Sequence, residues 1–194
     1  MFETFQKYLI DRTRLSQTEI ELILSNVKPR KLRKGQYLLQ EGDICNFVGF
    51  VESGCLRTYR VDFKGQDQII YFAIENWWAG DRESYLSQSP SRFYIDAVEE
   101  SEVILFTKGD FENLCGGIPA FGKLINATLE KALIASQNRI HSAISFTAEE
   151  KYIDFLNSNT QLANRLPQQM IASYLGMTPE TLSRIRNITI KKSK

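Results

Sequence analysis

The stretch QQMIASYLGMTPETLSRI, residues 168–185, decides how the end of the chain folds. A helix-turn-helix needs a small residue where its two helices meet and a residue with positive φ in the turn that follows. Ala172 and Gly176 meet these needs, because glycine adopts a positive φ at little cost. Thr178 and Pro179 are the N-cap and first residue expected of a second helix. The apolar residues that would hold the two helices together are Ile171, Leu175, Met177, Leu182 and Ile185.

The second helix of this motif has a polar face. If Leu182 and Ile185 point inward, a period of about 3.6 residues turns the polar side chains outward. Arginine can bond a guanine edge in two places and glutamate can accept from a cytosine amino group, so Glu180 and Arg184 have the chemistry of base recognition. In the alternative interpretation these two residues form an ordinary surface ion pair. The residues that we expect to contact DNA are Thr178, Glu180, Thr181, Ser183, Arg184, Asn187 and Lys191.

Basic side chains gather in the same part of the chain. Residues 165–194 contain six Lys and Arg side chains and one Glu, a net charge of +5, whereas the whole chain has a formal charge of +1. Binding to double-stranded DNA requires cations that neutralise phosphates. A basic surface alone is also common on proteins that bind no nucleic acid. The prediction of a DNA partner therefore depends on the basic charge together with the helix pattern.

Residues 30–106 have the pattern of short β-strands. Runs rich in β-branched and aromatic residues, among them FVGFV, CLRTYRV, QIIYFAI and EVILF, are separated by glycines. This pattern predicts an antiparallel sandwich or barrel. Ahead of it, apolar residues three and four positions apart up to about Val27 predict short amphipathic helices.

A long helix is predicted for residues 119–145, where apolar residues follow a helical stripe. Such a helix either bridges two domains or forms the seam of a two-chain coiled coil. Because DNA readers of this kind work as dimers, we favour the seam and expect a homodimer through residues 119–145. Thr147 and Glu150 then form a capping box for a further helix, and the polar stretch NSNTQLANRL is expected to be a connection.

Two stretches, LLQEGDICNFVGFVESG at residues 38–54 and IASYLGMTPETLSRIR at residues 171–186, resemble the CRP/FNR superfamily of bacterial regulators. The resemblance runs from about Val27 to Ile188. It implies a sensor barrel of the cyclic-nucleotide-binding type and a regulator of transcription that binds DNA as a dimer, with RNA polymerase as a further partner. Pro179 stands where many members of the family have a base-contacting arginine, which implies a different operator sequence.

With this resemblance, the predicted fold class is α+β and the chain has three parts. Residues 1–118 form an N-terminal antiparallel β jelly-roll barrel with flanking helices, which is the sensor domain. Residues 119–145 form the long dimerisation helix, and residues 146–194 form a C-terminal winged helix-turn-helix that binds DNA.

The stretch WWAGDRESYLSQSPSRFYIDA, residues 77–97, corresponds to the ligand pocket of family members that bind cyclic AMP. In those members a Gly-Glu pair holds the ribose and an Arg-Ser pair neutralises the cyclic phosphate. Gly80 and Asp81 match the first pair, whereas Ser91 takes the place of the arginine and Arg92 follows one residue late. An offset of one residue in a strand moves a side chain to the opposite face, which implies weak or no binding of cyclic AMP. A bulge that turned Arg92 inward would reverse this expectation.

The remaining residues argue against a cofactor and against catalysis. Three scattered cysteines do not supply the roughly four thiolates of an iron–sulfur cluster. One histidine, His141, cannot provide the ligands of a metal-dependent enzyme built on a jelly roll. It lies on the predicted long helix, where we expect a surface or interface residue and not an axial ligand of haem. The aromatic residues Tyr71, Phe72, Trp77 and Trp78 either line a pocket for another effector, whose identity is unknown, or belong to the barrel core, which we favour.

No apolar run approaches the roughly 18 residues that span a bilayer, and the first residues lack the pattern of a signal peptide. The sequence therefore predicts a cytoplasmic protein with no membrane partner. A second function stays open, in which the barrel is a ligand-binding regulatory module that acts on a protein partner. That module would have no salt-dependent affinity for DNA, whereas a DNA regulator loses affinity steeply as salt rises.

Overall fold

The computed structural model describes residues 2–192 of the chain, with side chains as far as residue 188. The chain divides into two compact units, which are described separately. The first unit consists of Met1–Arg60 and Tyr71–Glu130, and the second consists of Val61–Ile70 and Lys131–Lys194. Within the described part of the chain, none of the helices is both long and apolar enough to cross a membrane.

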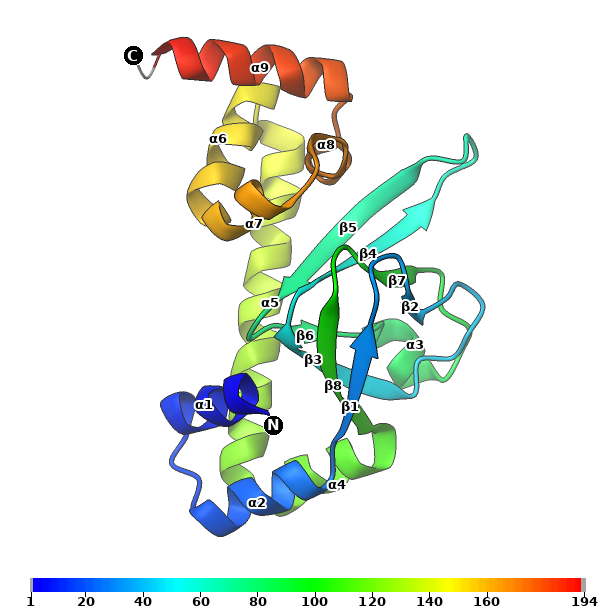
Figure 1. The fold of residues 1–194 in the computed structure, drawn as a ribbon, viewed down its shortest axis with the longest axis vertical. Helices are drawn as coiled ribbons and strands as arrows, with labels where there is room; N and C mark the ends of the chain where they lie inside the picture. Colours follow the sequence, from blue (N-terminus) through cyan, green and yellow to red (C-terminus); the bar gives the residue numbers. More distant parts are fainter. Residues whose placement is uncertain (1, 193–194) are drawn as a thin grey trace. The chain divides into compact units, whose positions relative to one another are not determined.

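The strands form two four-stranded sheets. They are β1 (Lys28–Leu32), β2 (Tyr37–Leu39), β3 (Phe47–Ser53), β4 (Cys55–Val61), β5 (Asp67–Ile74), β6 (Trp78–Ala79), β7 (Tyr94–Ala97) and β8 (Ser101–Thr107) (Figure 1). The strand order is β1-β8-β3-β6 in one sheet and β2-β7-β4-β5 in the other, and neighbouring strands pair antiparallel. This is the order of an eight-stranded jelly roll, so the predicted barrel is confirmed.

Helices flank the barrel strands in the first unit. They are α1 (Glu3–Arg12), α2 (Gln17–Ser25), α3 (Arg82–Ser87), α4 (Lys108–Gly117) and the first turns of α5 (Pro119–Ser145). The first N–H groups of α1 have no partner within the helix. The buried carboxylate of Glu52 in β3 accepts the N–H groups of Thr4 and Phe5, at 2.7 and 2.9 Å. Helix α2 begins at a capping box in which Ser16 and Glu19 bond each other's backbone N–H. The two predicted N-terminal helices are thereby confirmed.

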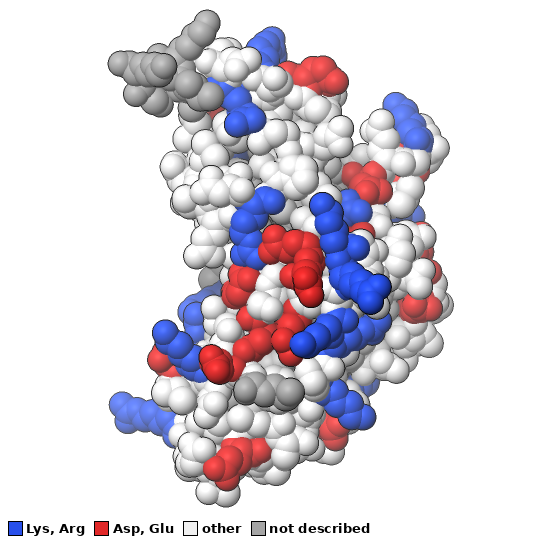
Figure 2. All heavy atoms as spheres, viewed as in Figure 1, with Lys and Arg blue, Asp and Glu red and all other residues white. Residues whose placement is uncertain are grey.

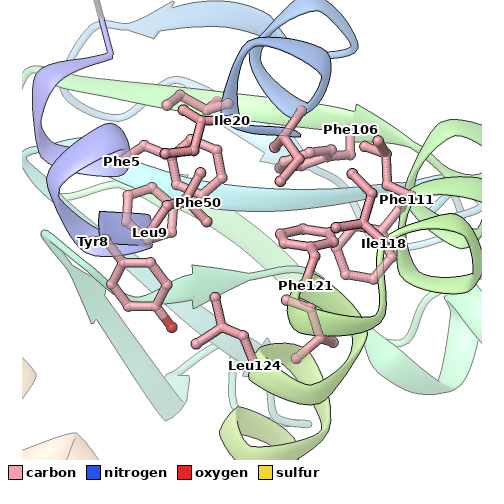
Figure 3. Packing of buried hydrophobic residues seen from close by; sticks show 14 residues of the cluster. Phe5, Tyr8, Leu9, Ile20, Phe50, Phe106, Phe111, Ile118, Phe121 and Leu124 are labelled. Atoms are coloured by element: carbon pink, nitrogen blue, oxygen red, sulfur yellow. The ribbon is translucent and has the colours of Figure 1, made fainter. Parts of the chain in front are cut away.

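The core of the first unit is aromatic (Figure 3). Phe5 of α1 lies against Phe50 of β3, with ring centres 4.7 Å apart. Phe106 of β8 lies 6.2 Å from Phe121 of α5, measured between ring centres. All four rings are fully buried, and burying a side chain of this size contributes roughly 1.5–3 kcal/mol. These contacts attach α1 and the start of α5 to the barrel.

Four aromatic residues could line an effector pocket or belong to the barrel core, and they have different surroundings. These residues are Tyr71, Phe72, Trp77 and Trp78. Phe72 is buried, and Trp78 packs with its ring 5.3 Å from that of Phe50. These two residues belong to the barrel core. Tyr71 and Trp77 stack on each other with ring centres 5.8 Å apart, and Tyr71 is 38% exposed. Trp77 is partly buried and packs against the core cluster that contains Val51 and Ala79, so Tyr71 is the exposed member of this pair.

The second unit contains the remaining helices. They are the part of α5 from Lys131 onward, followed by α6 (Ala148–Ser158), α7 (Thr160–Arg165), α8 (Gln168–Leu175) and α9 (Pro179–Lys192). The capping box of Thr147 and Glu150 is present at the start of α6, as predicted. Their core consists of Tyr152, Phe155, Leu162, Leu166, Ile171, Ala172, Leu182 and Ile185, which are all buried.

Two expectations for this unit need correction. The polar stretch expected to be a connection forms helix α7, because Leu162 is buried in the core and holds the polar residues around it in a helical turn. The wing expected beside the helix-turn-helix is not found among residues 146–192, where all the regular structure is helical.

Candidate nucleic-acid interface

Helices α8 and α9 form the predicted helix-turn-helix. Gly176 has a φ of 68°, the left-handed conformation that the turn requires. Its N–H donates to the carbonyl oxygen of Ser173 at 3.1 Å, and the N–H of Met177 donates to that of Ala172 at 3.0 Å. This pair of bonds is a Schellman motif, which ends α8 and reverses the chain direction. Ala172 is fully buried, so the small residue lies where the helices meet, as predicted.

The start of α9 is fixed by local contacts. The hydroxyl of Thr178 accepts the N–H of Thr181 at 3.2 Å, which is the expected N-cap, and Pro179 is the first residue of the helix. Leu182 and Ile185 are 0% and 5% exposed and anchor the inner face of α9. With both of these residues inside, the opposite face of α9 points to solvent.

The structure exposes most of the residues that were predicted to contact DNA. Those exposed are Thr178, Glu180, Ser183, Arg184 and Asn187, while Thr181 is half-buried. Lys191 lies outside the residues whose side chains are described. Figure 2 shows Lys or Arg side chains beside an acidic one at the end of the molecule where α9 lies in Figure 1.

The exposed face of α9 carries a shallow hollow rather than an enclosed pocket. It is lined by Pro179, Glu180, Ser183, Arg184, Asn187 and Ile188. All of these residues come from a single helix, and the hollow is open to solvent, unlike the enclosed pockets that hold small molecules.

Glu180 is held in its ionised form. Its own backbone N–H and the Thr178 hydroxyl both bond the carboxylate and lower the pKa of Glu180. A glutamate kept ionised can accept a hydrogen bond from a base amino group. Glu180 and Arg184 are both described, and no ion pair within 4.0 Å joins them in the single chain.

The four residues matched to a cyclic nucleotide pocket lie in the first unit. Asp81 and Ser91 are buried and bond each other, with the Ser91 hydroxyl donating to the Asp81 carboxylate at 2.7 Å. The other oxygen of that carboxylate accepts the N–H of Glu83 at 3.0 Å and caps α3. Gly80 precedes this pair with a φ of 152°. The structure therefore brings Gly80, Asp81 and Ser91 together and uses the polar groups of Asp81 and Ser91 within the protein.

Arg92 lies apart from these three residues. Its side chain is 59% exposed and bonds the carboxylate of Glu83 at 2.5 Å. The backbone before it is held in place, because the N–H of Ser91 donates to Asp43 and the carbonyl of Ser91 accepts from Gly42, each at 2.8 Å. A cyclic phosphate at this place would meet a hydroxyl bonded to a carboxylate instead of a guanidinium. The guanidinium of Arg92 lies on the outside, away from the bonded pair of Ser91 and Asp81.

The cysteine and histidine side chains do not form a metal site. Among the described residues, no group of three or more His, Cys, Asp and Glu side chains is arranged to hold a metal ion. Cys45 and Cys55 are buried, and Cys115 is half-buried. Burial raises the pKa of the Cys115 thiol to about 11. His141 is exposed on α5.

The apolar face of α5 is open to solvent in the single chain. The large apolar side chains on this face are Leu133, Ile140 and Ile144, which are 61%, 60% and 79% exposed. They are seven and four positions apart, the spacing of a coiled-coil seam. We call these three residues the α5 face.

Sequence reasoning passed over two polar residues of the second unit, Arg139 and Ser173. Both bond backbone atoms of residues that are distant along the chain. A backbone partner leaves no trace in residue types, so the sequence offers no signal for these contacts.

Residues 29–117 match the family model described as Cyclic nucleotide-binding domain. The Fumarate and nitrate reduction regulatory protein of Vibrio cholerae is 27% identical over 178 residues, which cover 86% of this chain and 70% of the relative. The Anaerobic regulatory protein of Haemophilus influenzae is 25% identical over 184 residues, which cover 88% of this chain and 70% of that relative.

Solved structures share the fold. FixK2 from Bradyrhizobium japonicum has a TM-score of 0.76 at 21% identity and covers 86% of both chains. The Catabolite Activator Protein of Thermus thermophilus has a TM-score of 0.59 at 21% identity, covering 96% of this chain and 88% of the other. The domain match, the regulatory relatives and the shared fold make this chain similar to the CRP/FNR family of regulatory proteins.

Proposed function

We propose that this protein is a sequence-specific DNA-binding regulator of transcription, with α9 as the helix that reads base edges. The exposed polar face of α9 carries this proposal, because two buried anchors and a capped start hold that face toward solvent. Glu180, Ser183, Arg184 and Asn187 would contact bases, and Thr178, Thr181 and Lys191 would contact the backbone or flanking groups. A double-stranded DNA of suitable sequence is the partner.

The regulator acts as a homodimer through residues 119–145, with the α5 face as the seam. Three large apolar side chains in heptad spacing are exposed in the single chain, and a second α5 would cover them. Two recognition helices would then meet DNA about 34 Å apart, one helical turn. Residues 1–118 would serve as the sensor domain and 146–194 as the DNA-binding domain.

The sensor barrel does not use cyclic AMP as its effector in this proposal. The bond between Asp81 and Ser91 and the outward Arg92 support this. The function requires neither a metal nor catalysis, and we place the protein in the cytoplasm, where its DNA and RNA polymerase are found.

Salt-dependent DNA affinity distinguishes this function from action on a protein partner. We would select duplexes from a random library with the unmodified protein and measure binding by fluorescence anisotropy at several salt concentrations. A DNA regulator loses affinity steeply as salt rises, whereas a module that acts only on protein shows no such affinity. Failure to select or retain any duplex at low salt would contradict the proposal.

Three variants assign roles to side chains. Arg184→Ala should lower the preference for the selected duplex over random duplex, because a base contact contributes roughly 1–3 kcal/mol of discrimination. Lys191→Ala should weaken binding to both duplexes alike. Arg14→Ala, an exposed arginine of the first unit, is the matched control and should change neither. Equal losses on both duplexes for Arg184→Ala would refute its role in base reading.

A further inference from the structure

Three segments meet inside the second unit. They are the hairpin segment Val61–Ile70, helix α5 and helix α8. Strand β5 begins within the hairpin segment and is an edge strand, because it stands last in its sheet. An edge strand presents backbone N–H and C=O groups that need partners.

Ser173 of α8 supplies such partners. Its hydroxyl donates to the carbonyl oxygen of Asp67 at 2.5 Å and accepts the N–H of Ile69 at 3.0 Å. Ile69 is 4% exposed, so its N–H would be left without a partner if the hydroxyl were removed. The first helix of the helix-turn-helix is thus bonded directly to the edge of β5.

Arg139 of α5 also contacts both β5 and α8. We call the contacts of Ser173 and Arg139 with these two elements the junction. One of its guanidinium nitrogens donates to the carbonyl oxygens of Ile69 and Tyr174, at 3.2 Å each. The guanidinium carbon also lies 4.1 Å from the centre of the Tyr174 ring, a cation–π contact. A single cation therefore bridges strand β5 and helix α8.

We propose that Ser173 and Arg139 are positioning residues for DNA binding, because their junction holds α8 in the orientation that presents α9 to DNA. This inference rests on the proposed function. Helix α9 follows α8, since the turn at Gly176 and the buried Leu182 and Ile185 fix the two helices to each other. The recognition face of α9 is exposed while the junction is closed, so the closed state can bind DNA and is the competent one in this proposal.

Opening the junction lets the helix-turn-helix adopt other orientations. The apparent affinity for DNA then falls in proportion to the population of the competent orientation. Neither residue lies on the recognition face of α9, so the loss arises without removal of a contact to DNA.

The test compares Ser173→Ala, Arg139→Lys and the control Ser158→Ala, an exposed serine at the end of α6. The probe is the duplex that the unmodified protein selects from a random library, and affinity is measured well below the melting temperature of every variant. We expect Ser173→Ala and Arg139→Lys each to weaken binding about three- to tenfold, with Ser158→Ala within twofold. Lysine keeps the charge but lacks the planar fork, so a loss in Arg139→Lys cannot come from weaker attraction to phosphates.

Hydrogen exchange of the Ile69 amide is the second measurement. Ser173→Ala should speed this exchange at least about tenfold in the free protein, and Ser158→Ala should leave it unchanged. Unchanged exchange at Ile69, or unchanged or tighter DNA binding in both junction variants, would overturn the inference. If the unmodified protein retains no duplex, the proposed function fails, and the role of the junction in DNA binding fails with it. If the unmodified protein binds DNA and the junction variants bind equally well, only the positioning role fails.

Discussion

Titration with cyclic AMP examines the sensor barrel most sharply. In a pocket that holds the cyclic phosphate, an inward arginine provides two charge-assisted hydrogen bonds of about 1.5–3 kcal/mol each. Losing both weakens binding by a factor on the order of 10² to 10⁴. A pocket with a dissociation constant of about 1 μM would therefore weaken to one between about 0.1 and 10 mM in this protein.

Turning Arg92 inward would cost free energy, because several contacts of the surrounding backbone and side chains must be broken. The ion pair of Arg92 with Glu83 is exposed and screened by solvent, so this pair alone would hardly oppose the movement. The backbone bonds of Ser91 to Gly42 and Asp43 must also be broken, as must the buried bond between Ser91 and Asp81. Each of these contributes about 0.5–1.5 kcal/mol, or more where the partner is charged.

Isothermal titration calorimetry gives the answer directly. We expect no saturable heat at cyclic AMP concentrations below about 0.1 mM, and the same result for Glu83→Ala, which frees Arg92 from its ion pair. Micromolar binding that Arg92→Ala abolishes would refute this reasoning, because it would require Arg92 to reach the phosphate.

Further outcomes follow from single side chains. Leu182→Ala should lower the free energy of unfolding of the helix-turn-helix by about 2–5 kcal/mol in denaturant unfolding, because the side chain is 0% exposed. The control Ser183→Ala should change it by less than about 0.5 kcal/mol, and equal effects would contradict the inward placement of Leu182. Leu133→Asp should convert the dimer to monomer in sedimentation, while Asn138→Asp, which adds the same charge elsewhere on α5, should not; a Leu133→Asp dimer would exclude the α5 face as the seam. Burial disfavours the Cys115 thiolate and raises its pKa to about 11, so alkylation by iodoacetamide should still be rising about tenfold per pH unit between pH 8 and 10; a plateau near pH 9 would show an ordinary thiol.

The helix-turn-helix could be predicted from the sequence because its determinants are local. Ala172, Gly176 and Thr178 lie within seven residues of one another, and each acts on the backbone beside it. The heptad spacing of the α5 face is equally visible along the chain. Such features need no knowledge of distant contacts.

Helix α7 and the inner bonds of the barrel could not be predicted in this way. Asn157, Ser158 and Asn159, which favour turns, precede α7 and suggested a connection, and burial of Leu162 by other helices decides the conformation of the segment. Ser91 and Asp81 are ten positions apart, and only the fold shows that they bond each other. Ser173 meets Ile69 across more than a hundred residues through a backbone atom, which no pattern of residue types records.

Guanine footprinting with dimethyl sulfate tests the central claim most directly, because the reagent attacks N7 in the major groove, where Arg184 is expected to bond. On the selected duplex, the unmodified protein should protect guanines in two half-sites about 10 base pairs apart, and Arg184→Ala should lose that protection while Arg14→Ala keeps it. Protection that Arg184→Ala leaves intact, or DNA binding that protects no major-groove guanine in a guanine-containing site, would contradict the assignment of α9 as the reading helix.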